Sequence, residues 1–293
     1  MLFNIYVNDL FHAVKHSNIT SFADDTTLYK IGKNYKSLFD NVNEDLQLLA
    51  KWYKDNNLIL NTNKTNYILF RRKQNKYNDE YSLKINETVL KRKKSVLLLG
   101  MHIDETMTWD THYNFLKKKL NSALFILKQL KYAISKTHLK MIYHALFESY
   151  LNYGCMLWTN TKRSNLSTIQ KLQIKALKCM NHGKKTTFDK EKILDIHQLQ
   201  ILSLHKFMYR IHKHTISNNI QSFFTPNSTI HNYKTRQAKN SHIKKFQYQQ
   251  TINSFLYKGP SSWNKLPREI THLSRTTFNS KVKQLLIKSL TNQ

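Results

Sequence analysis

Residues 21–29 read SFADDTTLY, in which Asp24 and Asp25 stand side by side between two runs of β-prone residues. The flanking runs, 19–22 and 27–31, predict a hairpin with the two acids at its turn. Two carboxylates on a tight turn suit a divalent metal ion, because Mg²⁺ takes oxygen ligands and usually shares them with substrate phosphates. Aspartate is also an ordinary turn residue, so the pair by itself leaves both interpretations open.

The composition places these acids in a strongly basic chain. The 293 residues include 47 Lys+Arg and 18 Asp+Glu, which gives a net charge of +29. Such a charge indicates a nucleic-acid partner, because basic side chains release counterions from phosphates. An alternative is codon bias, since Lys far outnumbers Arg and Asn is abundant, as in an AT-rich genome. With 40% hydrophobic and 12% aromatic residues the chain can form real cores, which excludes a disordered tail.

Cysteine usage and hydropathy bear on where the protein works. Cys155 and Cys179 form no C-x-x-C pair and no zinc knuckle, so we expect buried thiols without a disulfide partner in a reducing compartment. No apolar run approaches the ~18 residues of a membrane span. The first residues, MLFNIYVNDLF, lack the basic n-region of a signal peptide. We therefore expect an intracellular protein, nuclear and/or cytoplasmic, without a membrane partner.

The spacing of apolar residues changes from a period of 2 to about 3.6 after Asp104. Before that point it predicts a helix over 1–10, the hairpin of 19–31 and a helix over 35–52. Short strands at 58–60 and 66–70, a small hairpin over 81–90 and one strand over 95–103 follow. The first hundred residues are therefore predicted to be α+β.

After Asp104 the pattern predicts amphipathic helices. Their apolar stripes comprise Tyr113, Leu116, Leu120, Ala123, Leu127 and Leu130, then Leu139, Ile142, Leu146 and Tyr150, then Leu166, Ile169, Leu172, Ala176 and Met180. A fourth helix is expected over 198–216, a loose polar segment over 217–250 and a last helix over 276–290.

Several stretches resemble the motifs of one polymerase family. FADDTTLY resembles the catalytic hairpin of reverse transcriptases, whose common form is [FY]-x-D-D, and LFNIYVNDL resembles the stretch after the nucleotide-pocket motif in non-LTR retrotransposon polymerases, the Jockey-like elements and their relatives. Later motifs resemble, in the family's order, the next palm motif (KWYKDNNLILNTNKTNYILF), the primer grip and thumb entry (LLLGMHIDETMTWDTHYNFLKKKL), a thumb motif (YLNYGCMLW) and a C-terminal signature (YKGPSSWNKLP). The resemblance covers nearly all of the chain.

The resemblance implies an α+β fold that begins with a partial polymerase palm, made of antiparallel β-hairpins with helices. The palm, with the catalytic hairpin and the primer grip, is expected over residues 1–105. A mainly helical thumb-like region is expected over 106–216, and a basic C-terminal region with a loose segment and a compact tail over 217–293.

By the same resemblance, Asp24 would bind both Mg²⁺ ions of a two-metal site, and Asp25 would hold the hairpin or touch one ion. Lys64 would take the place of the lysine that is proposed to protonate the leaving pyrophosphate. An ordinary solvated loop lysine is the alternative for Lys64.

The resemblance also implies contacts to nucleic acid. Leu99 and Gly100 would lie in the primer grip, where close backbone approach favours glycine. Lys117, Lys118 and Lys119 would face the primer–template duplex, and a solvated helix face is the alternative.

Other aromatic and histidine residues are expected to be structural. Trp109 and Trp158 are predicted to be core residues rather than platforms for stacking bases. His205, His212 and His214 invite a metal interpretation, but no paired cysteine or acid supports a closed site, so we expect structural or phosphate-contacting roles.

The function implied for the full enzyme is that of an RNA-directed DNA polymerase, a nucleotidyltransferase that uses an RNA template, a DNA primer, deoxynucleoside triphosphates and two Mg²⁺ ions. That family also needs a metal-binding Asp, fingers residues and a P-Q-G segment upstream of MLFNIYVNDL, which this sequence does not contain. We therefore expect a C-terminal fragment, from a gene model cut at an internal Met or from a decayed element copy, without polymerase activity alone. The alternatives are a noncatalytic nucleic-acid-binding protein and a decayed product without function.

Overall fold

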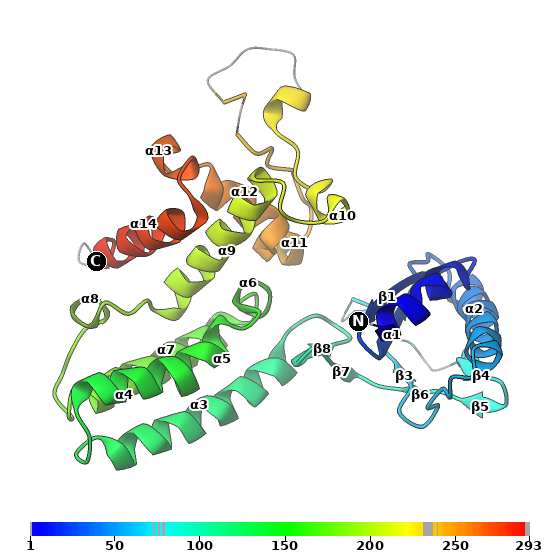
Figure 1. Ribbon diagram of the computed structural model, residues 1–293, viewed down its shortest axis with the longest axis horizontal. Coiled ribbons are helices and arrows are strands. Elements are labelled where there is room, and N and C mark those ends of the chain that lie inside the picture. Colours follow the sequence, from blue (N-terminus) through cyan, green and yellow to red (C-terminus); the bar gives the residue numbers. More distant parts are fainter. Residues whose placement is uncertain are drawn as a thin grey trace. The chain divides into compact units, whose positions relative to one another are not determined.

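The computed structural model describes residues 2–72, 74–75, 77, 80–230, 237–238 and 240–290 (Figure 1). The chain divides into two compact units. Unit 1 comprises Met1–Leu99 and Ile103–Met107, and unit 2 comprises Gly100–His102 and Thr108–Gln293. Nearly all strands belong to unit 1 and unit 2 is mainly helical, which confirms the α+β class.

Unit 1 contains one long helix and many short elements. Their bounds are α1 Leu2–Tyr6, η1 Asn8–His12, β1 Asn18–Phe22, β2 Asp25–Tyr29, α2 Tyr35–Asp55, β3 Asn66–Tyr67, β4 Lys84–Ile85, β5 Thr88–Val89, β6 Lys91–Arg92, β7 Ser95–Leu98 and β8 Met101–Asp104. The pairs β1–β2 and β4–β5 are antiparallel, β3–β6 is parallel, and β7 pairs with β8.

Most predicted elements of unit 1 are present. The 19–31 hairpin, the helix over 35–52 and the hairpin around 86–87 are confirmed as β1–β2, α2 and β4–β5. Asn34 caps α2, because its side chain accepts a hydrogen bond of 2.8 Å from the backbone N–H of Lys36. The expected helix over 1–10 is broken into α1 and the 3₁₀ helix η1.

Three strand predictions are wrong. Residues 58–60 form no strand, and 66–70 contain only the two residues of β3. The single strand over 95–103 is instead the β7–β8 hairpin. Its turn uses Leu99 at φ 46° and Gly100 at φ 78°, backbone values that end an extended strand.

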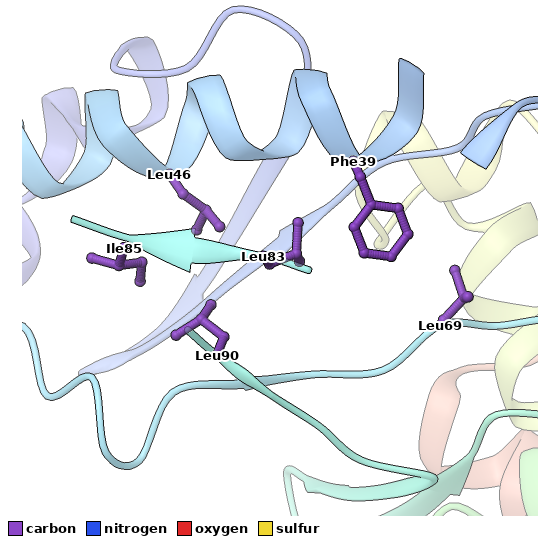
Figure 2. Packing of buried hydrophobic residues seen from close by; sticks show 6 residues of the cluster. All are labelled: Phe39, Leu46, Leu69, Leu83, Ile85 and Leu90. Atoms are coloured by element: carbon purple, nitrogen blue, oxygen red, sulfur yellow. The ribbon is translucent and has the colours of Figure 1, made fainter. Parts of the chain in front are cut away.

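The core of unit 1 lies between one face of α2 and the short strands that follow it. Figure 2 shows its buried side chains, which are Phe39, Leu46, Leu69, Leu83, Ile85 and Leu90. Three tyrosines surround Phe39, with ring centroids 6.0 Å away for Tyr67, 5.8 Å for Tyr77 and 5.7 Å for Tyr81. Leu28 of β2 packs against this cluster and so anchors the first hairpin to the core.

A buried ion-pair network joins three segments of unit 1. Glu105, whose side chain is 10% exposed, accepts a hydrogen bond of 2.8 Å from Nη2 of Arg71 and another of 2.8 Å from Nη2 of Arg92. Backbone bonds run beside it, from Arg71 N–H to Glu105 O at 2.9 Å and from Glu105 N–H to Lys94 O at 2.9 Å. The carboxylate thus fastens the segment before β7 to the segment after β8.

Unit 2 is built from helices. Their bounds are α3 Asp110–Leu130, α4 Lys136–Tyr143, η2 His144–Glu148, α5 Ser149–Asn152, α6 Cys155–Trp158, α7 Arg163–Met180, α8 Phe188–Glu191, α9 Ile196–His212, α10 Asn218–Gln221, η3 Asn227–Thr229, α11 Gln249–Asn253, α12 Phe255–Trp263, α13 Arg268–Thr271 and α14 Arg275–Lys288. Helices α3, α4 and α7 pack together, and α9 packs against α12 and α14 (Figure 1). Part of the predicted loose segment, 231–236 and 239, lies outside the described residues.

The helical stripes are partly as predicted. All five residues of the α7 stripe are buried, and so is the α3 stripe except Leu130. The stripe over 139–150 is wrong after its first residue. The fully buried side chains there are instead Leu139, Tyr143, Phe147 and Leu151, four residues apart. Tyr143 ends α4, and the wider turn of the π-helical segment η2 keeps this spacing through Phe147 and Leu151.

The predicted burial of the two tryptophans and the two cysteines is confirmed. Trp109 is 6% exposed and Trp158 is 1% exposed, so both are core residues. Cys155 and Cys179 are buried and free, and burial raises the pKa of the Cys155 thiol to about 12. Among the described helices, none is both long and apolar enough to cross a bilayer.

Candidate catalytic hairpin

The β1–β2 hairpin holds the two adjacent acids at a two-residue turn. Phe22 pairs with Asp25, which leaves Ala23 and Asp24 as the turn. Ala23 has φ 54°, a left-handed conformation that tight hairpin turns require. Asp24 therefore lies in the turn, and Asp25 is the first residue of β2.

Both carboxylates are directed to solvent. Asp24 and Asp25 are exposed, and Phe22 beside them is 66% exposed. Within the described residues neither carboxylate has a hydrogen-bond or ion-pair partner. Their oxygens are therefore open to an external ligand.

Contacts with α2 fix the hairpin behind its turn. Thr26 Oγ1 and Tyr53 OH share a hydrogen bond of 3.1 Å. Farther from the turn, the buried carboxylate of Asp45 accepts hydrogen bonds from the backbone N–H groups of Lys15 at 2.8 Å and His16 at 3.2 Å, just before β1. Lys30, just after β2, donates to the carbonyl of His16. The long helix thus positions the strands that present the acids.

Asp45 keeps its charge despite being buried. Burial opposes ionisation, but the nearby hydroxyl of Ser17 and the hydrogen bonds from the backbone N–H groups of Lys15 and His16 outweigh it and lower the pKa of the carboxyl. Asp45 is a positioning residue that the sequence pattern did not predict. A signal existed, because Asp45 interrupts the apolar stripe of α2 next to Leu46, and an acid on a buried face usually has a partner.

The structure places Lys64 in the turn between α2 and β3. Its backbone N–H bonds Asn61 O at 3.2 Å and Asn61 Oδ1 at 3.1 Å, and the residue is exposed. The described structure brings Lys64 into no hydrogen bond or ion pair with Asp24 or Asp25. Its assigned role stays a prediction.

The predicted primer-grip residues form the β7–β8 turn, where the two units divide. A Cβ added at Gly100 would lie 3.5 Å from Cε1 of Tyr153, an ordinary contact, so the positive φ rather than crowding favours glycine there. Leu99 also has a positive φ, and its side chain is 45% exposed.

Lys117, Lys118 and Lys119 lie on α3 and are all exposed. The Nζ of Lys119 lies 5.7 Å from the ring centroid of Phe115 and 5.9 Å from that of Tyr150. These lysines belong to unit 2, so the structure gives no joint site with the acids of unit 1.

Two of the histidines considered as metal ligands have structural contacts. His205 Nε2 shares a hydrogen bond of 2.7 Å with Ser262 Oγ, and His212 Nε2 shares one of 2.8 Å with Ser241 Oγ. The third, His214, contacts Gln221. These hydrogen bonds account for where the three side chains lie.

The fit of the hairpin to metal ions is partial. Within the described residues no group of three His, Cys, Asp or Glu side chains could hold a metal ion. Asp24 and Asp25 supply oxygen donors of the right chemistry, but two carboxylates do not complete a two-ion site.

Comparison with known proteins gives a family match over the part of the chain that contains the hairpin. Residues 1–103 match the family model described as reverse transcriptase (RNA-dependent DNA polymerase). The chain is 25% identical over 174 residues to the retrovirus-related Pol polyprotein from type-1 retrotransposable element R1 of Bradysia coprophila. That match covers 57% of this chain and 17% of the polyprotein, so the chain spans a small part of that relative. No solved structure matches the chain.

Reverse transcriptases use divalent metal ions and act on a nucleic-acid template and primer. The family match contains the hairpin with its two acids, the turn of Lys64 and the β7–β8 turn. Residues 1–103 therefore match the reverse transcriptase family, and the chain is similar to a part of the Pol polyprotein of a type-1 retrotransposable element.

Proposed function

We propose that the chain supplies the catalytic hairpin and the thumb of an RNA-directed DNA polymerase. In the full enzyme the reaction is template-directed transfer of a nucleotide from a deoxynucleoside triphosphate to a DNA primer on an RNA template. One observation carries the proposal: two adjacent, exposed carboxylates, without partners among the described residues, lie at a two-residue β-turn inside the segment that matches the reverse transcriptase family.

In this proposal Asp24 and Asp25 are ligands for Mg²⁺, with Asp24 shared between two ions. Bound Mg²⁺ neutralises charge on the reacting phosphates. A further carboxylate would complete the site, because the described residues hold no third ligand beside the pair. The chain alone is then a weak ion binder and not a polymerase.

Other residues take supporting roles. Lys64 supplies a mobile ammonium near the leaving pyrophosphate, and the Leu99–Gly100 turn brings backbone close to the primer strand. Lys117, Lys118 and Lys119 bind phosphates of the primer–template duplex, supported by their exposure on α3.

The second candidate function is noncatalytic nucleic-acid binding. The net charge of +29 and the exposed lysines of α3 favour it. It requires no role for Asp24, so substitution of the two acids distinguishes the two candidate functions.

The ligand role is tested by titrating the purified chain with Mn²⁺ and following paramagnetic broadening of backbone amide signals. We expect selective broadening at residues 22–27, lost in Asp24→Asn/Asp25→Asn. The matched control is Asp40→Asn/Asp55→Asn, which removes two exposed acids from α2 of the same unit. Equal broadening in the wild type and the hairpin variant would overturn the ligand role.

Activity is tested by RNA-templated primer extension with Mg²⁺. We expect no extension by the purified chain. Extension that Asp24→Ala abolishes would show that the chain completes the metal site by itself.

A further inference from the structure

Unit 2 contains a pocket of about 560 Å³ between the end of α9 and the start of α14. Four of its lining side chains carry basic groups: Arg210 and Lys213 from α9 and its C-cap, His272 from the α13–α14 connection, and Arg275 from the first position of α14. No acidic residue is among the described residues that line it.

The cationic groups of this pocket have no acidic partners in the part of the chain that the structure describes. Arg210, Lys213 and Arg275 are exposed, and none makes an ion pair with a described residue. In contrast, Arg71 and Arg92 share Glu105 at 2.8 Å each. The guanidinium groups of the pocket therefore remain available to an external anion, which Arg binds in a bidentate manner.

The pocket has a fixed frame. Tyr209 OH donates a hydrogen bond of 2.9 Å to the carbonyl of Leu273, and the rings of Tyr209 and Phe278 lie 4.5 Å apart. These contacts hold the last turn of α9 against the first turn of α14. The spacing of Arg210 and Arg275 is thus set by packed side chains rather than by a free loop.

The start of α14 adds to the positive potential. Ser274 caps this 14-residue helix through a hydrogen bond of 3.4 Å from the N–H of Thr277, and no acidic residue occupies the first turn. The helix dipole at this end is positive and is normally balanced by an acid. Here an arginine takes that position.

Positive charge continues along both helices beyond the pocket. Lys206 lies one turn before Arg210 on α9. Its pKa is lowered, first by burial and then by the charges of Lys283 and Arg275 on α14, while Glu148 acts in the opposite direction. Cations are therefore close enough to repel each other, and an anion between the helices would relieve that repulsion.

We propose that this pocket binds backbone phosphates of a nucleic-acid strand. The inference rests on the proposed nucleic-acid function and adds to it a contact site in the C-terminal part of the chain, distinct from Lys117–Lys119 of α3. The four basic groups reach solvent, so a continuous strand can pass across them. The contact depends on phosphate charge and does not discriminate between bases.

A purely structural reading gives a different expectation. Arg210 lies in the last turn of α9, where a cation stabilises the helix dipole. Under that reading its loss lowers stability and leaves nucleic-acid affinity unchanged. Thermal unfolding and binding must therefore be measured on the same variants.

The test variant is Arg210→Gln/Arg275→Gln in the full chain. The control is Lys171→Gln/Lys175→Gln, which removes the same charge from the exposed face of α7. Binding of a labelled single-stranded RNA is followed by anisotropy across a salt series. We expect the pocket variant to bind on the order of tenfold more weakly and its log–log salt slope to fall by about 1.4 relative to the control, as two lost phosphate contacts predict. Equal slopes and affinities in the two variants would overturn the proposal.

Acetylation of Lys213, quantified by mass spectrometry, identifies the ligand directly. We expect the RNA to protect Lys213 but not Lys171, and inorganic phosphate at the same phosphate concentration to give no protection. Equal protection by inorganic phosphate would assign a small-anion site. Protection by phosphatidylserine vesicles but not by RNA would assign a membrane contact. Either result rejects the proposal.

The outcomes also separate this proposal from the function it rests on. If the wild-type chain binds RNA and the pocket variant matches its control, only the pocket assignment fails. If the wild-type chain does not bind RNA at all, the nucleic-acid function itself fails.

Discussion

The β1–β2 hairpin and the helices of unit 2 use their residues in opposite ways. At the hairpin turn the acids are exposed and Phe22 is 66% exposed, and Leu28 joins the hairpin to a core of short strands. In unit 2 many large side chains, including Tyr143 and Phe147, are completely buried. The difference indicates that the hairpin is built to present groups to a ligand, whereas folding energy is concentrated in the helices.

The largest effect we expect is a difference in how the stability of the two units falls with pH. Burial lowers the pKa of His205 to about 4, and burial with the charge of His102 lowers that of His112 to about 4. The usual value is 6.5, so both are held neutral. Their contribution is full above pH 6.5 and is lost as pH falls from 6.5 through about 4, by up to about 3 kcal/mol for each.

Unit 1 should lose stability only at a lower pH than unit 2. Asp45 has a lowered pKa, so its contribution is present above its usual value of 3.8 and is lost as pH falls through the lowered value. Urea unfolding between pH 7 and 3, read by probes in each unit, checks this. His205→Gln should reduce the loss in unit 2 between pH 6.5 and 4. Simultaneous loss in both units above pH 5 would contradict the comparison.

Shortening a buried side chain in the core of unit 2 should have the next largest effect on stability. Phe147→Ala removes a ring that is 0% exposed and stacked on Tyr143 at 5.2 Å, and should lower the free energy of unfolding by about 3–5 kcal/mol. Phe125→Ala, on α3 with 61% exposure, is the matched control and should stay within about 0.5 kcal/mol. Chemical denaturation measures both, and similar losses would argue against a core at Phe147.

The ion pair of unit 1 should have an intermediate effect. Glu105→Gln leaves Arg71 and Arg92 without their shared carboxylate and should destabilise unit 1 by about 2–3 kcal/mol. Glu87→Gln, an exposed acid in the β4–β5 turn, provides the comparison. Hydrogen exchange of unit 1 amides reports the difference, and unchanged exchange would show that the network contributes nothing.

The hairpin acids should matter least for stability. Asp24→Asn/Asp25→Asn alters exposed groups without described partners, so the free energy of unfolding should change by less than about 0.5 kcal/mol. Unfolding curves of the same variant used for Mn²⁺ binding test this. A loss above about 1 kcal/mol would mean that the acids hold the hairpin together.

The elements that the sequence predicted correctly are those determined by the pattern of neighbouring residues. The hairpin followed from β-prone runs around a polar turn, and α7 from apolar spacing, because both are determined by neighbouring residues. The burial of Tyr143 was missed because the predicted stripe placed its neighbour Ile142 in the core, and that of Phe147 because a π-helical segment has no distinct apolar period. The strand over 95–103 was misread, because Leu99 adopts a positive φ that its side chain does not favour.

The candidate site was only partly accessible to sequence reasoning. Asp24 and Asp25 were found through adjacency and the motif. Asp45 and Glu105 act through residues distant in the sequence, 29 positions to His16 and 34 to Arg71, so spacing could not reveal their partners. The α9–α14 pocket joins positions 210 and 275 and also depended on the packing of two helices.

The alanine at the hairpin turn has a consequence for ligand binding. Glycine at position 23 would reach the left-handed conformation without strain, but it would also let the free turn sample many others. Alanine is disfavoured in that conformation, so the pairing of β1 with β2 has to hold it there. The turn that presents Asp24 is therefore a strained one, kept in shape by the strands behind it.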